Sequence, residues 1–414
     1  MTDFYLGFDF GTSGARSIAL DQNRQIVHTI KVNPPQYQNP EDWQNVLWEM
    51  LHSLPLAIKK RLRAIAFSAT SSTVLLCDSQ GNPLDKPIWY NDSRGQIIVD
   101  QLKTFVPKNN LSLSATSSLA KLYWWYQQPI FDQAHYLLHQ ADWLGFLLHG
   151  KLGISDYHNA LKLGYDVEKL TYPQWLKKQP FFRVLPHIKA PGDRVGKITT
   201  KIAQQCQINP DCVVKAGTTD SIAAFLASGV NQAGEGVTSL GSTLVLKLLS
   251  NTKVDDSRYG IYSHRLGNLW LTGGASNTGG AVLKHFFSDQ QLQELSLQIN
   301  PNILLNYHYY PLIKKGDRFP INDPNLEPKL TPKPQEKILF LQGLLEGIAE
   351  IEQKGYHLLQ YLGATPLTKV YTAGGGANNQ TWSNIRQLML NIPVEKSPQT
   401  EAAYGTALLA LNRG

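Results

Sequence analysis

The sequence predicts a mixed α/β protein built from two domains. Segments with strand patterns alternate with amphipathic helical patterns, of which 338–362 is the longest example. A strand, a turn of glycine and hydroxyl residues and a second strand occur together twice, at 5–20 and at 237–249. A chain of 414 residues has room for two or three domains. The repeated unit therefore indicates two domains built on one plan.

The first of these units is residues 5–20, YLGFDFGTSGARSIAL. Its glycine loop, 11–14, joins two strands, whereas a dinucleotide fingerprint and a P-loop each lead from a strand into a helix. The backbone N–H groups of such a hairpin, with the Thr12 and Ser13 hydroxyls, can bind phosphate, and Asp9 at the strand end can hold a hydrated magnesium ion. An ordinary β-turn rich in glycine and serine is the alternative interpretation.

Three further glycine clusters lie in the second half of the chain. The second hairpin, 237–249, turns at Gly241-Ser242-Thr243. Two more clusters, in 269–287 and 369–390, run from a strand pattern through glycines toward a helix pattern. Glycine at such points lets the backbone approach a ligand that a side chain would displace. A plain helix cap is the alternative for 374–376.

Composition narrows the class of protein. Hydrophobic residues make up 42% and charged residues 17% of the chain, which is typical of a globular protein. No apolar run reaches the length of a membrane span, and the N-terminus leads almost directly into a strand, so we expect a cytoplasmic protein without a membrane partner. The net charge is +7, but the only dense basic run, 59–63, has the pattern of a solvated helix end. A preference for small anionic ligands explains this charge as well as nucleic-acid binding does, and we expect no nucleic-acid partner.

Cysteine and histidine usage gives no metal pattern. The three cysteines, Cys77, Cys206 and Cys212, lack paired spacing, which indicates reduced thiols. The eleven histidines form no short zinc motif.

The domain boundary is expected near 227–231, between an apolar helix and the second hairpin. The domains are then 1–227 and 228–399, and the closing helix in 400–414 could pack on either, with the first preferred. The proline-rich segment 311–334 is predicted to be an extended surface stretch or a linker.

Asp220 has two interpretations from its local sequence. It follows a strand pattern at 212–216 and a Gly-Thr-Thr turn, and it precedes an apolar helix. An aspartate at a helix start can be an N-cap, or it can present its carboxylate as a general base.

Taken together, eight segments resemble the FGGY family of carbohydrate kinases in that family's order. They are FDFGTSGAR, PIWYNDSR (87–94), DWLGFLLHGKLGISDYHNALKLG, AGTTDSIAAF (216–225), SLGST, KKGDRFPINDP (314–324) with GLLEGIAE, TAGGGANNQTWSNI, and EAAYGTALLA (401–410). The resemblance implies two ribonuclease H-like domains around a central cleft, as in actin and heat-shock ATPases, with ATP and Mg²⁺ as cofactors.

The resemblance also implies a role for each candidate residue. Asp220 would be the general base, and Asp9 would hold magnesium through water. The phosphate-binding set would be Gly11, Thr12, Ser13, Gly241, Ser242, Gly273 and Gly274. The nucleoside set would be Gly374, Gly375, Gly376 and Asn379. The sugar set would be Asp9, Ser72, Trp89, Asp92, Arg94 and Asp220, although a tryptophan after Pro-Ile, as Trp89 is, is more often a core residue.

One departure from the family pattern bears on the substrate. Where many relatives have Gly-Gln-Met-His-Gly against the sugar, residues 69–73 are Ala-Thr-Ser-Ser-Thr, and the chain is short for the family. This form resembles the cyanobacterial and plant xylulose-kinase-like branch, which favours a ketopentose, first D-ribulose and then D-xylulose.

Other classes of protein remain open at this level, as does the oligomeric state. The main alternative is a non-enzymatic actin-like ATP-binding module, which would need neither a base at Asp220 nor the sugar-side segment 87–94. A heat-shock type chaperone and a nucleic-acid-binding protein are the remaining alternatives.

Overall fold

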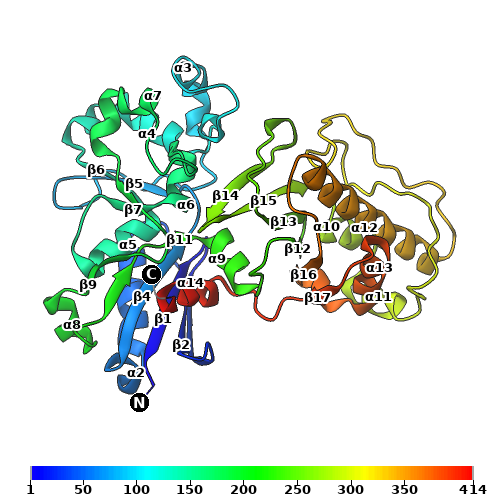
Figure 1. Cartoon of the computed structure of the whole chain (residues 1–414), viewed down its shortest axis with the longest axis horizontal. Helices are drawn as coiled ribbons and strands as arrows, with labels where there is room; N and C mark the ends of the chain where they lie inside the picture. The colour runs from blue at the N-terminus through cyan, green and yellow to red at the C-terminus, as the bar shows by residue number, and fades with distance from the viewer. Residues whose placement is uncertain (1, 413–414) are drawn as a thin grey trace. The chain divides into compact units, whose positions relative to one another are not determined.

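The computed structural model describes residues 2–412 and divides the chain into two compact units (Figure 1). The division falls between Ala227 and Ser228, and the chain returns to the first unit at Glu401. Each unit has its own sheet and its own hydrophobic core, which confirms the α/β prediction. No helix within residues 2–412 has both the length and the apolar character that a bilayer crossing requires.

The first unit is built on a seven-stranded sheet of order β3-β2-β1-β4-β10-β9, in which β11 also pairs with β4. The strands are β1 (Phe4–Phe10), β2 (Ala15–Asp21), β3 (Ile26–Val32), β4 (Leu62–Ala69), β9 (Arg194–Lys197), β10 (Val213–Lys215) and β11 (Thr218–Thr219). Strands β1, β2 and β3 form antiparallel pairs, whereas β4 runs parallel to β1, β10 and β11. The alternating apolar residues of 5–20 thus form the expected hairpin.

Helices cover this sheet, and close glycine contacts fix one of them. The helices are α1 (Pro40–Ser53), α2 (Leu56–Lys59), α5 (Gln140–His149), α8 (Thr200–Cys206), α9 (Asp220–Ala227) and α14 (Ala402–Leu411). A Cβ atom on Gly7 of β1 would lie 2.2 Å from the Ala407 nitrogen, and one on Gly405 would lie 1.8 Å from the Ala223 oxygen. Helix α14 therefore packs directly on β1 and α9, which places the closing helix in the first unit.

A smaller region of the first unit carries the remaining elements between β4 and β9. Its strands form two pairs, β5 (Val74–Cys77) with β6 (Tyr136–His139) and β7 (Ile154–Asp156) with β8 (His187–Lys189). Its helices are α3 (Val99–Leu102), α4 (Ser118–Tyr126), α6 (Tyr157–Ala160) and α7 (Gln174–Lys177). Aliphatic and aromatic side chains from these elements form a separate core cluster.

The second unit repeats the plan of the first. Its sheet has the order β14-β15-β13-β12-β16-β17, with strands β12 (Glu235–Leu240), β13 (Leu244–Ser250), β14 (Tyr262–Leu266), β15 (Leu269–Ser276), β16 (Lys369–Ala373) and β17 (Val394–Lys396). Again an antiparallel hairpin, β12–β13, is followed by strands parallel to β12. The helices are α10 (Gly280–Phe286), α11 (Asp289–Ser296), α12 (Lys337–Tyr361) and α13 (Gln380–Leu390).

A buried ion pair ties helices to strands in this unit. The Arg386 guanidinium in α13 donates to both carboxylate oxygens of Glu352 in α12, at 2.6 and 2.7 Å, and both side chains are fully buried. Arg386 also donates to Thr372 of β16, and Thr238 of β12 donates to Glu352. Because breaking a buried pair leaves an uncompensated charge, these contacts fix the ends of β12 and β16 against the helices.

Two predictions about the second unit need correction. Gly273 and Gly274 do not lie in a loop but inside β15, where a Cβ on Gly273 would meet the Leu246 oxygen at 2.0 Å and one on Gly274 would meet the Phe319 ring. The segment 311–334 contains no helix or strand, as expected, but it is not a linker, because Phe319 and Asp317 are buried in the unit.

Candidate active site

The carboxyl ends of three parallel strands bring the central candidates of the first unit together. Strand β4 pairs in parallel with β1 on one side and with β11 on the other. Asp9 is the next-to-last residue of β1, and Asp220 directly follows β11 as the first residue of α9. Ser72 lies in the turn after β4. Ligands of open α/β sheets bind at this edge, so the three residues form one candidate site.

Asp9 lies beside the hairpin and is held by a short chain of hydrogen bonds. Ser68 of β4 donates to the Asp9 carboxylate at 2.8 Å, and Thr406 of α14 donates to the Ser68 hydroxyl at 2.8 Å. Burial raises the pKa of Asp9 to about 6, Ser68 opposes this rise, and the charge of nearby Asp220 adds to it. The Asp9 carboxyl group therefore titrates near pH 6, well above an ordinary aspartate.

Asp220 begins α9 in the position that the sequence predicted. Its side chain is partly buried, and Oδ1 accepts from the Ser221 N–H at 2.6 Å, a contact within its own first helical turn. This geometry is compatible with both interpretations, a helix-capping aspartate and a general base. Its charge acts on the pKa of two neighbours, because it raises that of Asp9 and partly offsets the lowering by burial at Lys162. Asp220 thus lies within the charged part of the site.

The strand before Asp220 is held from the side by α6. His158 Nδ1 lies 2.7 Å from the Thr218 hydroxyl of β11. Helix α6 is capped by Asp156, which accepts from the backbone N–H groups of His158 and Asn159 and is completely buried. Burial raises the pKa of Asp156, the charge of Asp142 adds to this rise, and the hydrogen bonds from Asn159 and His158 oppose it. The segment resembling the family's Asp-x-x-x-Ala motif is therefore a support for β11.

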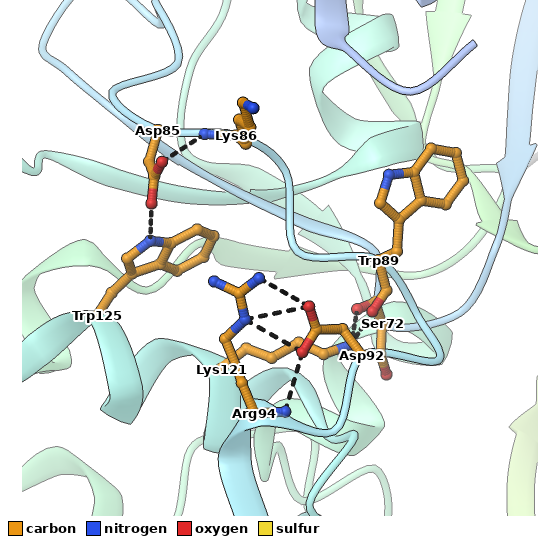
Figure 2. Close-up of polar contacts among 8 residues, drawn as sticks. All are labelled: Ser72, Asp85, Lys86, Trp89, Asp92, Arg94, Lys121 and Trp125. Carbon is orange, nitrogen blue, oxygen red and sulfur yellow. Dashed lines mark hydrogen bonds and ion pairs between the residues drawn. The ribbon is translucent and has the colours of Figure 1, made fainter.

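Four of the six sugar-side candidates, Ser72, Trp89, Asp92 and Arg94, lie together around one lysine (Figure 2). Lys121 of α4 is fully buried, and its ammonium donates to the Ser72 carbonyl at 2.7 Å and to the Trp89 carbonyl at 2.8 Å. Three residues after Trp89, Asp92 accepts from the Arg94 guanidinium at 2.7 Å. Sequence reasoning missed Lys121, whose only signal is a charge in the apolar run SLAKLYWWY.

Some of these sugar-side residues have side chains that are fully engaged by other protein groups, and one does not. Trp89 packs edge-on against buried Trp43, with ring centroids 5.5 Å apart, as a core tryptophan does. The Arg94 guanidinium lies 4.7 Å from the Trp124 ring centre and holds the pKa of Asp92 below its usual range by hydrogen bonding. Ser72 is different, because its hydroxyl is buried and has no hydrogen-bond partner among residues 2–412.

In the second unit, the hairpin turn at 241–243 lies against the start of α10. Gly280 and Ala281 donate their N–H groups to the carbonyls of Gly241 and Ser242, at 2.8 and 3.1 Å. Gly279 has φ +141°, and a Cβ there would lie 2.7 Å from the Thr243 carbonyl carbon. The glycine pair beside this turn is therefore 279–280, whereas Gly273 and Gly274 pair with β13 away from the turn. Its signal was a second Gly-Gly directly before an apolar helix.

The triple glycine lies next to the same hairpin. A Cβ on Gly374, which has φ +81°, would meet the Leu240 oxygen at 2.7 Å, and one on Gly376 would meet the Leu240 side chain. Gly375 faces open space. Asn379 caps α13 by accepting from Trp382 N–H, and its amide donates to Ser296. Two of the three glycines are thus required by packing, which leaves Gly375 as the one open to a ligand.

The residues present fit a hydrated magnesium ion at Asp9. No group of three acidic, histidine or cysteine side chains that could cage a metal occurs in the described part of the chain. Magnesium usually keeps several waters and uses one or two carboxylates with substrate phosphates, so one carboxylate beside a phosphate-type hairpin is a sufficient protein contribution.

Comparison with known proteins identifies the family. The model of the FGGY family of carbohydrate kinases, N-terminal domain, matches residues 4–227, and that of the C-terminal domain matches residues 236–412. The chain therefore belongs to the FGGY family of carbohydrate kinases. Its two-domain sugar-kinase fold agrees with the duplicated plan of its two sheets.

Individual relatives are distant but extend along the whole chain. A xylulose kinase from Staphylococcus epidermidis is 22% identical in an alignment that covers 98% of this chain and 87% of the relative. A gluconokinase from Bacillus subtilis is 22% identical, with 95% and 83% covered. The crystal structure described as a xyloylose kinase from Brucella ovis superposes with a TM-score of 0.84 at 21% identity, covering 99% of this chain and 90% of that one. The chain is thus a carbohydrate kinase similar to xylulose kinases.

Proposed function

We propose that this protein transfers the γ-phosphate of ATP to a hydroxyl of a ketopentose, with D-ribulose the first candidate and D-xylulose the second. The observation that carries the proposal is the cluster at the carboxyl ends of β1, β4 and β11. It combines a carboxylate at a helix start, Asp220, with a buried unpartnered hydroxyl, Ser72, and a second carboxylate beside the hairpin, Asp9.

Each task of phosphoryl transfer has a candidate residue in this arrangement. Asp220 would accept the proton of the attacking sugar hydroxyl. The N–H groups of the hairpin at 11–14 and the Thr12 hydroxyl would bind the γ-phosphate, and Gly241 and Ser242 would bind the other phosphates. Magnesium, when bound, neutralises charge on the phosphate oxygens, and Asp9 would hold it through water. We propose Gly375 as the glycine that the nucleoside approaches.

Support for a ketopentose comes from the turn after β4 and from the relatives. Thr70 and Thr73 bond to each other and to Gln140 and Tyr90, whereas the Ser72 hydroxyl is buried without a partner among residues 2–412. A small hydroxyl suits a polyol, because each sugar hydroxyl needs a partner when it is buried. Several relatives are xylulose kinases, and one is a gluconokinase, so xylulose and gluconate belong in any substrate test.

The test is a substrate screen in a coupled ADP-release assay. The panel is D-ribulose, D-xylulose, aldopentoses, glycerol, hexoses and gluconate, each with ATP and magnesium. We expect ADP release to depend on the added sugar and the highest kcat/KM with a ketopentose. If none of the sugars changed the rate of ADP release from its value without sugar, the result would contradict the proposal and favour an actin-like ATP-binding module. A preference for gluconate or glycerol would leave the kinase and correct the substrate.

A further inference from the structure

We infer that Lys121 is a positioning residue for the sugar, which holds the turn at Ser72 so that its hydroxyl is left for a substrate hydroxyl. This inference rests on the proposed function. Lys121 lies on α4, a helix that contributes no residue to the carboxylate cluster, and its hydrogen bonds to the site go to two backbone carbonyls.

The environment of Lys121 is unusual for an ammonium group. The side chain is fully buried among the apolar residues of α4 and the cluster that packs on it. Burying a charge without a counter-ion costs free energy unless hydrogen bonds compensate. Lys121 donates to the carbonyls of Ser72 and Trp89, at 2.7 and 2.8 Å, so it joins the turn after β4 to the segment that carries Asp92 and Arg94 (Figure 2). The side chain of Lys121 thus holds the turn at Ser72 and the segment that begins at Trp89 in place relative to each other.

Ser72 shows what this fixation achieves. Its backbone is left-handed, with φ +68°, which is unfavourable for a residue with a Cβ. Its carbonyl is bound to Lys121, while its hydroxyl is buried without a partner within residues 2–412. A buried hydroxyl without a partner is uncommon and points to a ligand that completes it. Strain of this kind persists where surrounding contacts impose it, and here the lysine supplies the contact.

The charges that face Lys121 agree with a role on the sugar side. Burial lowers its pKa to about 7, Asp92 opposes this lowering, and Lys162 and Arg94 add to it. The charge of Asp220 in turn raises the pKa of Lys162. Lys121 is therefore linked electrostatically, through Lys162, to the proposed base.

The chain offers a matched control for removing this lysine. Lys59 of α2 is also buried, and its ammonium donates to the His52 carbonyl at 2.8 Å. It lies in the same unit but at the opposite end of the main sheet from α4 (Figure 1). Lys59→Met and Lys121→Met therefore both remove a hydrogen bond from a buried ammonium group to a backbone carbonyl. Of the two substitutions, Lys121→Met is the one that removes a hydrogen bond to the turn at Ser72.

The experiment measures sugar binding and turnover in full-length variants. We expect Lys121→Met to raise the Kd and KM for D-ribulose, or for D-xylulose if that is preferred, by roughly tenfold or more, with the KM for ATP nearly unchanged. Lys59→Met should stay within about twofold of wild type in all three constants, even if both variants melt at lower temperature. A folded Lys121→Met with the sugar Kd of wild type would overturn the inference.

Ser72→Gly decides the outcome if Lys121→Met does not fold, and where Lys121→Met does fold, a double variant separates positioning from packing. Ser72→Gly relieves the left-handed strain, so it should melt no lower than wild type and yet bind sugar several-fold more weakly. In a Ser72→Ala background, Lys121→Met should add less than about threefold, because the lysine acts through that hydroxyl. Unchanged sugar affinity in Ser72→Gly, or a full loss on adding Lys121→Met to Ser72→Ala, would overturn the inference.

Titration calorimetry keeps this inference distinct from the proposed function. It detects sugar binding without turnover, so a wild-type protein that binds a ketopentose but releases no ADP would fail only the kinase proposal. Absence of binding to every sugar of the panel would overturn both.

Discussion

The two hairpins have one shape but carry different chemistry. The hairpin of the first unit joins β1 and β2, and that of the second joins β12 and β13, and each has an antiparallel neighbour strand on one side and a parallel one on the other. The next-to-last residue of the strand before the turn is Asp9 in the first unit and Ser239 in the second. Across the hairpin, Asp9 faces Arg16 and Ser239 faces Val245. Two hairpins with the same backbone plan can therefore differ in function through one side chain, because only the first carries a carboxylate at this position.

The carboxylates of the first unit should account for the largest effects on activity. We expect Asp220→Asn to lower sugar-dependent kcat by about 10²- to 10⁴-fold with nearly unchanged ATP affinity, because the amide keeps the shape and loses only proton acceptance. Steady-state assays with calorimetric ATP titration measure both quantities. A variant that keeps more than about a tenth of wild-type turnover would remove Asp220 from this role.

The pH dependence of turnover should report Asp9. Since burial raises its pKa to about 6, we expect activity that needs the ionised carboxylate to fall as pH drops below about 6. For folding the sign is opposite: a raised carboxyl pKa stabilises the fold most at low pH, and this contribution is lost as pH rises through about 6.

Ser68→Ala tests that assignment through a neighbour. It removes the hydrogen bond that lowers the pKa of Asp9, so the acidic limb of the pH profile should move to higher pH, with a loss of roughly tenfold near pH 6. Thr406→Val, which removes only the bond to Ser68, should move the limb less. An acidic limb at the same pH in Ser68→Ala would mean that another group controls it.

The hydroxyls of the two turns should give the smallest effects, and similar ones. Thr12→Ala and Ser242→Ala each remove one hydroxyl from an exposed turn residue, so we expect the KM for ATP to rise by about fivefold, the value of one hydrogen bond, without a change in melting temperature. A marked loss of stability would instead favour the ordinary β-turn interpretation. Unequal kinetic effects would show that the two hairpins also differ in how they hold phosphate.

The sequence correctly predicted those elements of the site that depend on neighbouring residues along the chain. The strands of both hairpins, the start of α9 at Asp220 and the helix after the triple glycine follow from alternation, turn residues and apolar periodicity. The sheet order that makes the two hairpins equivalent agrees with the plan inferred from their repetition.

Features that depend on distant contacts could not be predicted in this way. Gly273 and Gly274 have the composition of a loop, but Leu246 and Phe319 make them necessary inside a strand. Thr406 supports Asp9 through Ser68 from the opposite end of the sequence. Lys121 looks like one charge on an apolar helix until its two carbonyl acceptors are known.

The most direct test of the comparison replaces the residue at the equivalent position of each hairpin, Asp9 and Ser239, by a neutral side chain of similar size. Turnover is measured with ATP, magnesium and the preferred sugar for Asp9→Asn and Ser239→Ala, with melting temperatures as the control for folding. The account predicts a loss of roughly a hundredfold or more for Asp9→Asn and less than about threefold for Ser239→Ala. Comparable losses in both variants, or near wild-type turnover in a folded Asp9→Asn, would contradict it.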